Sequence, residues 1–159
     1  MIYHEERIDL FGMPAEYILV HCISSDFAMG AGIAKDFRDR FRIKAALCNQ
    51  YEQDEWNGHG YCHIVTHPES PWFVANLVTK KKYSDKPTYN TLKESLADFK
   101  NQLTQNNPGL CEPGDNPAAR IAMPLIGCGL DRLEWSQVKE IVMRTFKDLN
   151  IEVVVCRRD

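Results

Sequence analysis

The stretch Pro124-Leu125-Ile126-Gly127-Cys128-Gly129-Leu130-Asp131 decides how the fold of this chain is interpreted. It completes the apolar run 120–126 and adds two glycines and an aspartate, which is typical of a loop between a strand and a helix. A second glycine loop, Met29-Gly30-Ala31-Gly32, follows the apolar run 17–24, and Lys80 follows a third run at 72–79. Paired glycines let backbone N–H groups approach a diphosphate closely. If the three strands point the same way, these groups meet and indicate a nucleotide-sugar site.

Strand-like and helical segments alternate along the chain. We predict strands at 17–24, 60–66, 72–79, 120–126 and 151–156, with a turn at 67–71 and a surface loop at 106–117. Apolar residues at helical spacing predict three helices: one over 33–41, one that begins near Pro87-Thr88 and continues through Leu103, and one that carries Val138 to Leu149 on a single stripe. This alternation predicts mostly parallel strands with helices on both faces. Ligands of such sheets bind beyond the carboxyl ends of the strands.

Composition is that of one globular domain, predicted to span 1–159. The chain has 159 residues, 44% hydrophobic and 26% charged, with a net charge of −3. No apolar run is long enough for a membrane helix, and the acidic N-terminus is unlike a signal peptide. The six cysteines contain no CxxC pair, which favours free structural thiols over disulfides or a metal site and predicts a cytoplasmic protein.

A metal site is also disfavoured at the histidines His59, His63 and His67, which recur every fourth residue. His63 to His67 is predicted to begin on a strand, where that spacing does not bring side chains together. We therefore expect no metal and no cofactor.

Each motif also has a simpler interpretation. The glycines can be turn formers, Asp131 can cap a helix, and Lys80 can belong to a solvated run with Lys81 and Lys82. The argument for a functional site is therefore their predicted coincidence at one edge of the sheet.

Three separated blocks resemble a known family. They are His21-Cys22-Ile23-Ser24 with Met29-Gly30-Ala31-Gly32-Ile33-Ala34, then Thr79-Lys80-Lys81 with Lys86-Pro87-Thr88-Tyr89, then Gly127-Cys128-Gly129-Leu130-Asp131-Arg132-Leu133 with Trp135. In this order they resemble the macrodomain family, and within it the lysine–aspartate subfamily typified by terminal ADP-ribose protein glycohydrolase. The resemblance covers nearly the whole chain, from Asp9-Leu10 to the last strand.

The resemblance implies an α/β fold, a three-layer α/β/α macrodomain with a mixed, mostly parallel central sheet that binds ADP-ribose at one end. Asp9 would accept a hydrogen bond from the adenine amino group, with the Leu10 backbone beside it. The distal ribose and diphosphate would lie against the first glycine loop, and the second loop would close over the other side; the residues implied are Ser24, Met29, Gly30, Ala31, Gly32 and Ile33, then Pro124, Ile126, Gly127, Cys128, Gly129 and Leu130. Lys80 and Asp131 match the catalytic pair of the subfamily.

The implied activity is that of an ADP-ribosyl glycohydrolase, which removes mono-ADP-ribose from acidic protein side chains and can extend to O-acetyl-ADP-ribose or ADP-ribosylated nucleobases. Lys80 would form a transient adduct with the ribose, and Asp131 would act as acid and base. Two alternatives stay open: a phosphatase acting on ADP-ribose 1″-phosphate, and a reader module that binds ADP-ribose without turnover. The expected partners are ADP-ribose and ADP-ribosylated protein. Nucleic acid is less favoured by the acidic net charge, no membrane is involved, and a monomer is expected.

Overall fold

The structure is a computed structural model that describes residues 1–66 and 72–158. Within this part of the chain six strands form one sheet, in the order β1-β6-β5-β2-β4-β3. The strands are β1 (Ile2–Glu6), β2 (Tyr17–Ser24), β3 (Tyr61–Thr66), β4 (Phe73–Lys80), β5 (Ala119–Met123) and β6 (Ile151–Cys156). Only the edge strand β3 runs antiparallel to its neighbour; the other pairs are parallel. The prediction of a mixed, mostly parallel sheet is confirmed.

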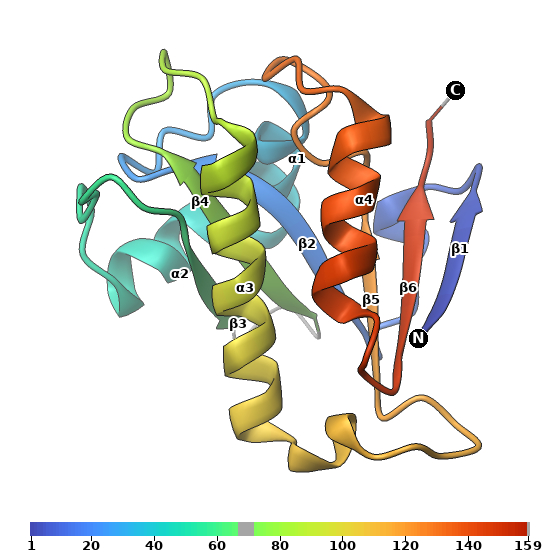
Figure 1. Cartoon of the computed structure of the whole chain (residues 1–159). Helices are drawn as coiled ribbons and strands as arrows, with labels where there is room; N and C mark the ends of the chain where they lie inside the picture. The colour runs from blue at the N-terminus through green and yellow to red at the C-terminus, as the bar shows by residue number, and fades with distance from the viewer. Residues whose placement is uncertain (67–71, 159) are drawn as a thin grey trace.

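Helices cover both faces of this sheet. Figure 1 shows α3 (Tyr89–Asn106) and α4 (Trp135–Phe146) on the near face, and α1 (Gly32–Phe41) and α2 (Ile43–Gln50) behind it. Two short 3₁₀ turns, η1 (Leu10–Gly12) and η2 (Pro108–Cys111), complete the elements. The three-layer α/β/α arrangement is therefore confirmed.

The core lies in two layers because successive side chains of a strand point to opposite faces. Val20 of β2 and Leu77 of β4 pack among the apolar residues of α3 and α4. Their neighbours Leu19 and Val78 pack on the other side with Phe37 of α1. All five side chains are fully buried, so β2 and β4 are anchored from both faces. Loops at the ends of these two strands therefore start from fixed positions.

One strand and one α-helix were not predicted from the sequence. Strand β1 alternates exposed and half-buried residues, and its IYHEE sequence lacks the continuous apolar run used to recognise the other strands. Helix α2 follows α1 after a single residue, Arg42, which has a φ of 52°. That left-handed residue ends one helix and starts the next, and an arginine carries no sequence signal for this turn.

Three predictions of local structure need correction. Strand β5 ends at Met123, since Pro124 has no N–H to donate to a neighbouring strand. Helix α4 ends at Phe146, although Leu149 is still buried beyond it. The predicted surface loop 106–117 contains η2, whose Leu110 is fully buried and whose carbonyl accepts a hydrogen bond from Asn150 N.

The remaining predictions concern smaller features. The predicted turn His67-Pro68-Glu69-Ser70-Pro71 lies outside the described residues. All six cysteines carry free thiols. Over 1–66 and 72–158, no helix has the length and apolar character needed to cross a membrane.

The sheet brings the important loops to one edge. Strands β1, β6, β5, β2 and β4 are parallel, so their carboxyl ends lie together at the top of Figure 1. Both glycine loops and Lys80 are at this edge, as predicted.

Candidate functional site

An ion pair joins Lys80 to Asp131 at the carboxyl edge of the sheet. Lys80 is the last residue of β4, and its Nζ lies 2.7 Å from Oδ1 of Asp131 in the loop after β5. The two side chains are only 14% and 16% exposed, whereas Lys81 and Lys82 are exposed. Helix α4 is preceded by Glu134 as its N-cap residue, so Asp131 does not cap it. The interpretations of Lys80 as solvated charge and of Asp131 as a cap are therefore wrong.

The position of Lys80 is set by its pairing with β2. Ser24 lies opposite Lys80 in the sheet, just after an irregularity in the register. Ser25 N donates a hydrogen bond to the Lys80 carbonyl at 2.9 Å, and Ser25 Oγ donates to the carbonyl of Lys81 at 2.6 Å. Ser25 is fully buried. These bonds fix the backbone at the lysine carbonyl and directly after it.

Asp26 joins the segments around the pair. Its Oδ1 accepts hydrogen bonds from Ser24 Oγ at 2.5 Å and from Ala28 N at 3.1 Å, and its Oδ2 accepts from Tyr83 N at 3.0 Å. The pKa of Asp26 is lowered, because these hydrogen bonds to the carboxylate outweigh the opposing effect of burial. This carboxylate therefore holds the β2–α1 loop against the segment that follows Lys80.

The first glycine loop has a strained backbone and open space around it. Phe27 and Met29 have φ values of 55° and 50° although both are buried side chains, and such conformations concentrate at functional sites. A Cβ on Gly30 would meet nothing within 4 Å. Ala31 precedes α1 without a side-chain cap, and the first turn holds no acidic residue. The N-terminus of α1 is thus suited to an anionic ligand.

The second glycine loop folds back toward the first. Gly127 has a φ of 73°, and a Cβ there would lie 3.0 Å from Leu133. Gly129 is open in the same way as Gly30. Leu130 is 62% exposed, yet its Cδ1 would lie 3.3 Å from a Cβ on Gly32, so the two loops touch. Lys86 Nζ donates a hydrogen bond to the Leu130 carbonyl at 2.8 Å and holds this loop beside Lys80.

Two cysteines lie close to the ion pair without the properties of a nucleophile. Burial raises the pKa of the Cys22 thiol, and the charge of Asp131 raises it further. Burial alone raises the pKa of Cys128 to about 11, and its Sγ donates to the carbonyl of Ile126. Both thiols stay protonated at neutral pH and line the site as small side chains.

Asp9 and Leu10 lie at the same sheet edge, at a distance from the ion pair. Asp9 follows β1 and accepts a hydrogen bond from Phe11 N at 3.0 Å, and Leu10 is buried in η1. Four strand spacings separate β1 from β4 in the sheet, which is about 19 Å. The predicted site residues are therefore arranged along one edge, suited to an elongated ligand, and the assigned contacts of Asp9 with adenine stay a prediction.

Of the three regularly spaced histidines, the structure describes His59 and His63. His59 lies 2.5 Å from a carboxylate oxygen of Glu94, His63 is on β3, and His67 lies outside the described residues. Throughout 1–66 and 72–158 no group of three histidine, cysteine or acidic side chains is arranged to hold a metal ion.

Asp26 and Lys86 were missed as site residues in the sequence. A local signal existed for Asp26, since Ser24-Ser25-Asp26 can form a side-chain hydrogen-bonded turn. Lys86 belongs to one of the blocks that resemble the family, but no local pattern indicates its contact with Leu130, which lies 44 residues further along the chain.

Curated relatives resemble the chain over most of its length. It is 35% identical over 147 residues to the Bos taurus protein named ADP-ribose glycohydrolase OARD1, and 34% identical over the same length to the Homo sapiens protein of that name. Each match covers 92% of this chain and 86% of the relative. No protein-family model matches the sequence.

Solved structures share the fold. The macrodomain of Thermus aquaticus DarG superposes with a TM-score of 0.73 at 22% identity, and the match covers 98% of this chain and 97% of the DarG macrodomain chain. The macrodomain of Mycobacterium tuberculosis DarG superposes with a TM-score of 0.69 at 19% identity, covering 96% and 97% respectively. At these identities the likeness is evidence of the fold alone.

Proposed function

Because this chain belongs to the macrodomain family and is a hydrolase acting on ADP-ribosyl linkages, we propose that it removes single ADP-ribose units from acidic protein side chains, using Lys80 and Asp131. The observation that carries this proposal is the largely buried 2.7 Å contact between Lys80 Nζ and Asp131 Oδ1. Pairs of a lysine and a carboxylate that are largely shielded from water in this way occur at catalytic sites. The pair stands beside open glycine loops suited to a diphosphate.

The ligand is proposed to lie along the carboxyl edge of the sheet. Adenine is assigned to the end at Asp9 and Leu10, and the diphosphate to the amides of the first glycine loop and the start of α1. The distal ribose then lies between Ser24 and the second glycine loop, with its anomeric carbon at Lys80. The open space at Gly30 and Gly129 supports this placement, because a ligand can approach the backbone there.

The ion pair suggests how the reaction proceeds. Lys80 Nζ donates a hydrogen bond to Asp131 Oδ1. In the first step the shared proton moves to Asp131, which leaves a neutral amine and a protonated carboxyl group. The amine attacks the anomeric carbon as its bond to the substrate carboxylate breaks, and Asp131 protonates the departing carboxylate. Asp131 then accepts a proton from water as water displaces the lysine. The products are free ADP-ribose and the unmodified acidic side chain.

The test is release of ADP-ribose from a protein carrying the modification on glutamate. Wild type should turn over, and Asp131→Ala should lose at least about 10²-fold in kcat, with a larger loss for Lys80→Ala. Lys82→Ala is the matched control, because it removes an exposed lysine two residues away. Full activity in Lys80→Ala would remove the lysine adduct from the pathway.

Trapping provides a second measurement. Reduction with borohydride in the presence of ADP-ribose should join the sugar covalently to Lys80, through the imine formed with the aldehyde of the opened ribose. Mass spectrometry should locate the adduct on the peptide that contains Lys80. Absence of hydrolysis together with release of phosphate from ADP-ribose 1″-phosphate would favour a phosphatase instead.

Nucleic acid carrying ADP-ribose is the second substrate class to assay. Lys81 and Lys82 are exposed directly after Lys80, and they supply positive charge beside the proposed reaction centre. If phosphate contacts contribute, KM for such a substrate should rise steeply with salt, whereas a protein substrate should respond less.

A further inference from the structure

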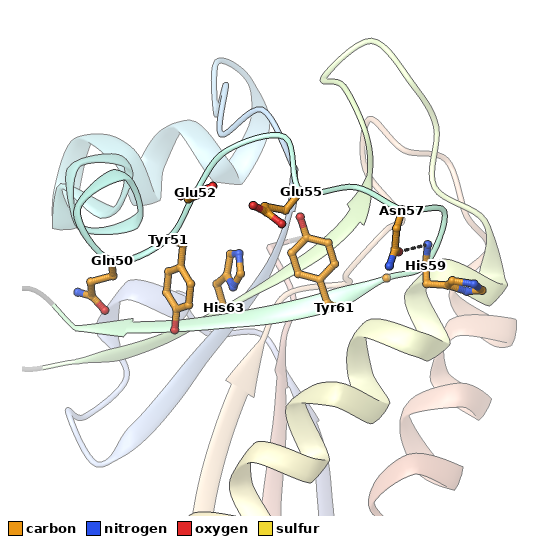
Figure 2. A pocket seen from close by; sticks show the side chains of 9 residues that line it. Gln50, Tyr51, Glu52, Glu55, Asn57, His59, Tyr61 and His63 are labelled. Atoms are coloured by element: carbon orange, nitrogen blue, oxygen red, sulfur yellow. Dashed lines mark hydrogen bonds between the residues drawn. The ribbon is translucent and has the colours of Figure 1, made fainter.

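A cavity of about 500 Å³ lies between β3 and the loop that precedes it, separate from the ion pair. Figure 2 shows the rings of Tyr51, His63 and Tyr61 in a row along β3, beneath the loop that carries Glu52, Glu55 and Asn57. The proposed reaction does not use any of these residues.

The cavity borders the proposed reaction site. Tyr61 opens β3 and pairs with Val78, which is two residues before Lys80 in β4. The overlying loop is tied to the β2–α1 loop, because Asp54 N donates to the Ser25 carbonyl at 2.8 Å and Gln53 Nε2 donates to the Asp26 carbonyl at 2.7 Å. A substrate chain at Lys80 can therefore reach the cavity within a few residues.

Aromatic rings form the floor of this cavity. Tyr51 stacks on His63 with ring centroids 3.7 Å apart, and Tyr61 meets His63 edge to face at 5.0 Å. Burial lowers the pKa of His63 to about 4, so its ring is neutral at pH 7. Rings of this kind offer π faces that attract a cation.

The walls are rich in hydrogen-bond acceptors. Glu52 and Glu55 line the cavity, and none of its nine lining residues, all within the described part of the chain, is lysine or arginine. Burial raises the pKa of Tyr61 to about 12, with the nearby charges of Glu55 and Asp54 adding to the effect. The cavity therefore combines negative charge with aromatic rings.

Addition of a peptide strand to β3 is a poor alternative. The outer edge of β3 already has side-chain partners: Cys62 N donates to Asp98 at 2.8 Å, and the Ile64 carbonyl accepts from Tyr51 Oη at 2.9 Å. The Cys62 carbonyl also accepts from Gln102. A peptide would have to displace these bonds to pair with the strand.

We propose that this cavity binds an arginine side chain of the substrate protein, beside the ADP-ribosylated residue. A guanidinium group has five donors in a planar fork and stacks on aromatic rings, which matches the carboxylates of Glu52 and Glu55 beside a row of rings. Lysine offers a compact charge without the planar fork and suits the cavity less well. The position of the arginine in a substrate protein rests on the proposed function, whereas the binding of a guanidinium does not.

The first experiment measures binding alone, with the full chain and acetyl-arginine N-methylamide as the probe. Backbone amide shifts of Gly60 and Tyr61 should change saturably in NMR titrations. Acetyl-citrulline N-methylamide, which has the same shape without the charge, should bind at least about tenfold more weakly, as should the lysine analogue. Glu55→Gln should weaken arginine binding by a similar factor, and Glu112→Gln, the same change on an exposed loop outside the cavity, should not.

The second experiment measures hydrolysis of peptides with ADP-ribose on glutamate and either arginine or citrulline a few residues away. Arginine should lower KM about tenfold without changing kcat, and this advantage should disappear in Glu55→Gln. Equal binding of the arginine and citrulline probes, or shifts confined to other residues, would overturn the arginine site. Arginine binding without any hydrolysis would keep the site and reject the proposed function.

Discussion

Replacement of Asp26 tests whether this carboxylate holds the proposed active site together. Its two oxygens accept three hydrogen bonds, from Ser24 Oγ, Ala28 N and Tyr83 N, at 2.5, 3.1 and 3.0 Å. In Asp26→Ala all three donors lose their acceptor. The bonds join two segments that flank Lys80, so their loss should loosen both.

The expected cost follows from the burial of each donor. Hydrogen bonds to a charged group contribute about 1.5–3 kcal/mol when the donor is shielded from water. Ser24 is buried and Ala28 is half-buried, whereas Tyr83 is exposed and water can replace its bond. Two substantial bonds and one small one give about 3 kcal/mol lost from the free energy of unfolding in Asp26→Ala. Asp26→Asn keeps one acceptor oxygen and should lose about half of that.

Urea unfolding at pH 7 measures the loss in stability, and calorimetric titration with ADP-ribose measures the effect on the proposed site. We expect ADP-ribose affinity to fall about tenfold in Asp26→Ala, because the loop must be ordered again on binding. Asp39→Ala, an exposed aspartate on α1, is the control and should change stability by less than about 0.5 kcal/mol. An Asp26→Ala protein with wild-type stability would refute the assignment of Asp26 as the residue that joins these segments.

Three further predictions concern acid stability and the glycines. Burial lowers the pKa of His21 to about 4, so the folded state favours the neutral ring more strongly than the unfolded state does. The contribution of His21 to the free energy of unfolding should therefore be complete above pH 6.5 and should fall by about 3 kcal/mol as the pH decreases from 6.5 toward 4. His21→Gln, which keeps a donor for Asn76 Oδ1, should flatten that loss in urea unfolding curves measured across this pH range; an unchanged slope would contradict it. Gly60→Ala should lose at least about 3 kcal/mol from the free energy of unfolding, because the new Cβ would lie 2.0 Å from the Thr91 carbonyl in α3. A urea unfolding midpoint equal to that of wild type would show that this contact is wrong. Gly30→Ala should unfold like wild type yet bind ADP-ribose at least about tenfold more weakly in calorimetry, since its Cβ enters space proposed for the ligand; unaltered affinity would place the diphosphate elsewhere.

Local sequence patterns were sufficient for the central strands and the apolar faces of the helices. The run 17–24 forms β2 with the predicted bounds, because continuous apolar residues are buried on both faces of a central strand. Strand β1 was missed because it is a half-exposed edge strand that is stabilised by pairing with β6, from the other end of the chain. Such long-range pairing has no local pattern.

In the candidate site, too, some features follow from local sequence patterns and others do not. The glycine loops and Lys80 were identified from the sequence because each directly follows an apolar strand, and parallel strands bring their carboxyl ends to one edge. Their grouping was therefore predictable once the strand directions were inferred. The contact between Lys80 and Asp131 was expected only from the family resemblance.

What the sequence by itself determined is the α/β alternation, the glycine loops at strand ends and the types of residue available for chemistry. Only the tertiary structure decided that Lys80 and Asp131, 51 residues apart, form a largely buried ion pair. It also decided that Asp26 joins two segments around that pair, and that three rings and two carboxylates line an open cavity elsewhere on the sheet. The physical reason is that backbone periodicity is local, whereas hydrogen bonds and ion pairs depend on side-chain positions that packing across the sheet determines.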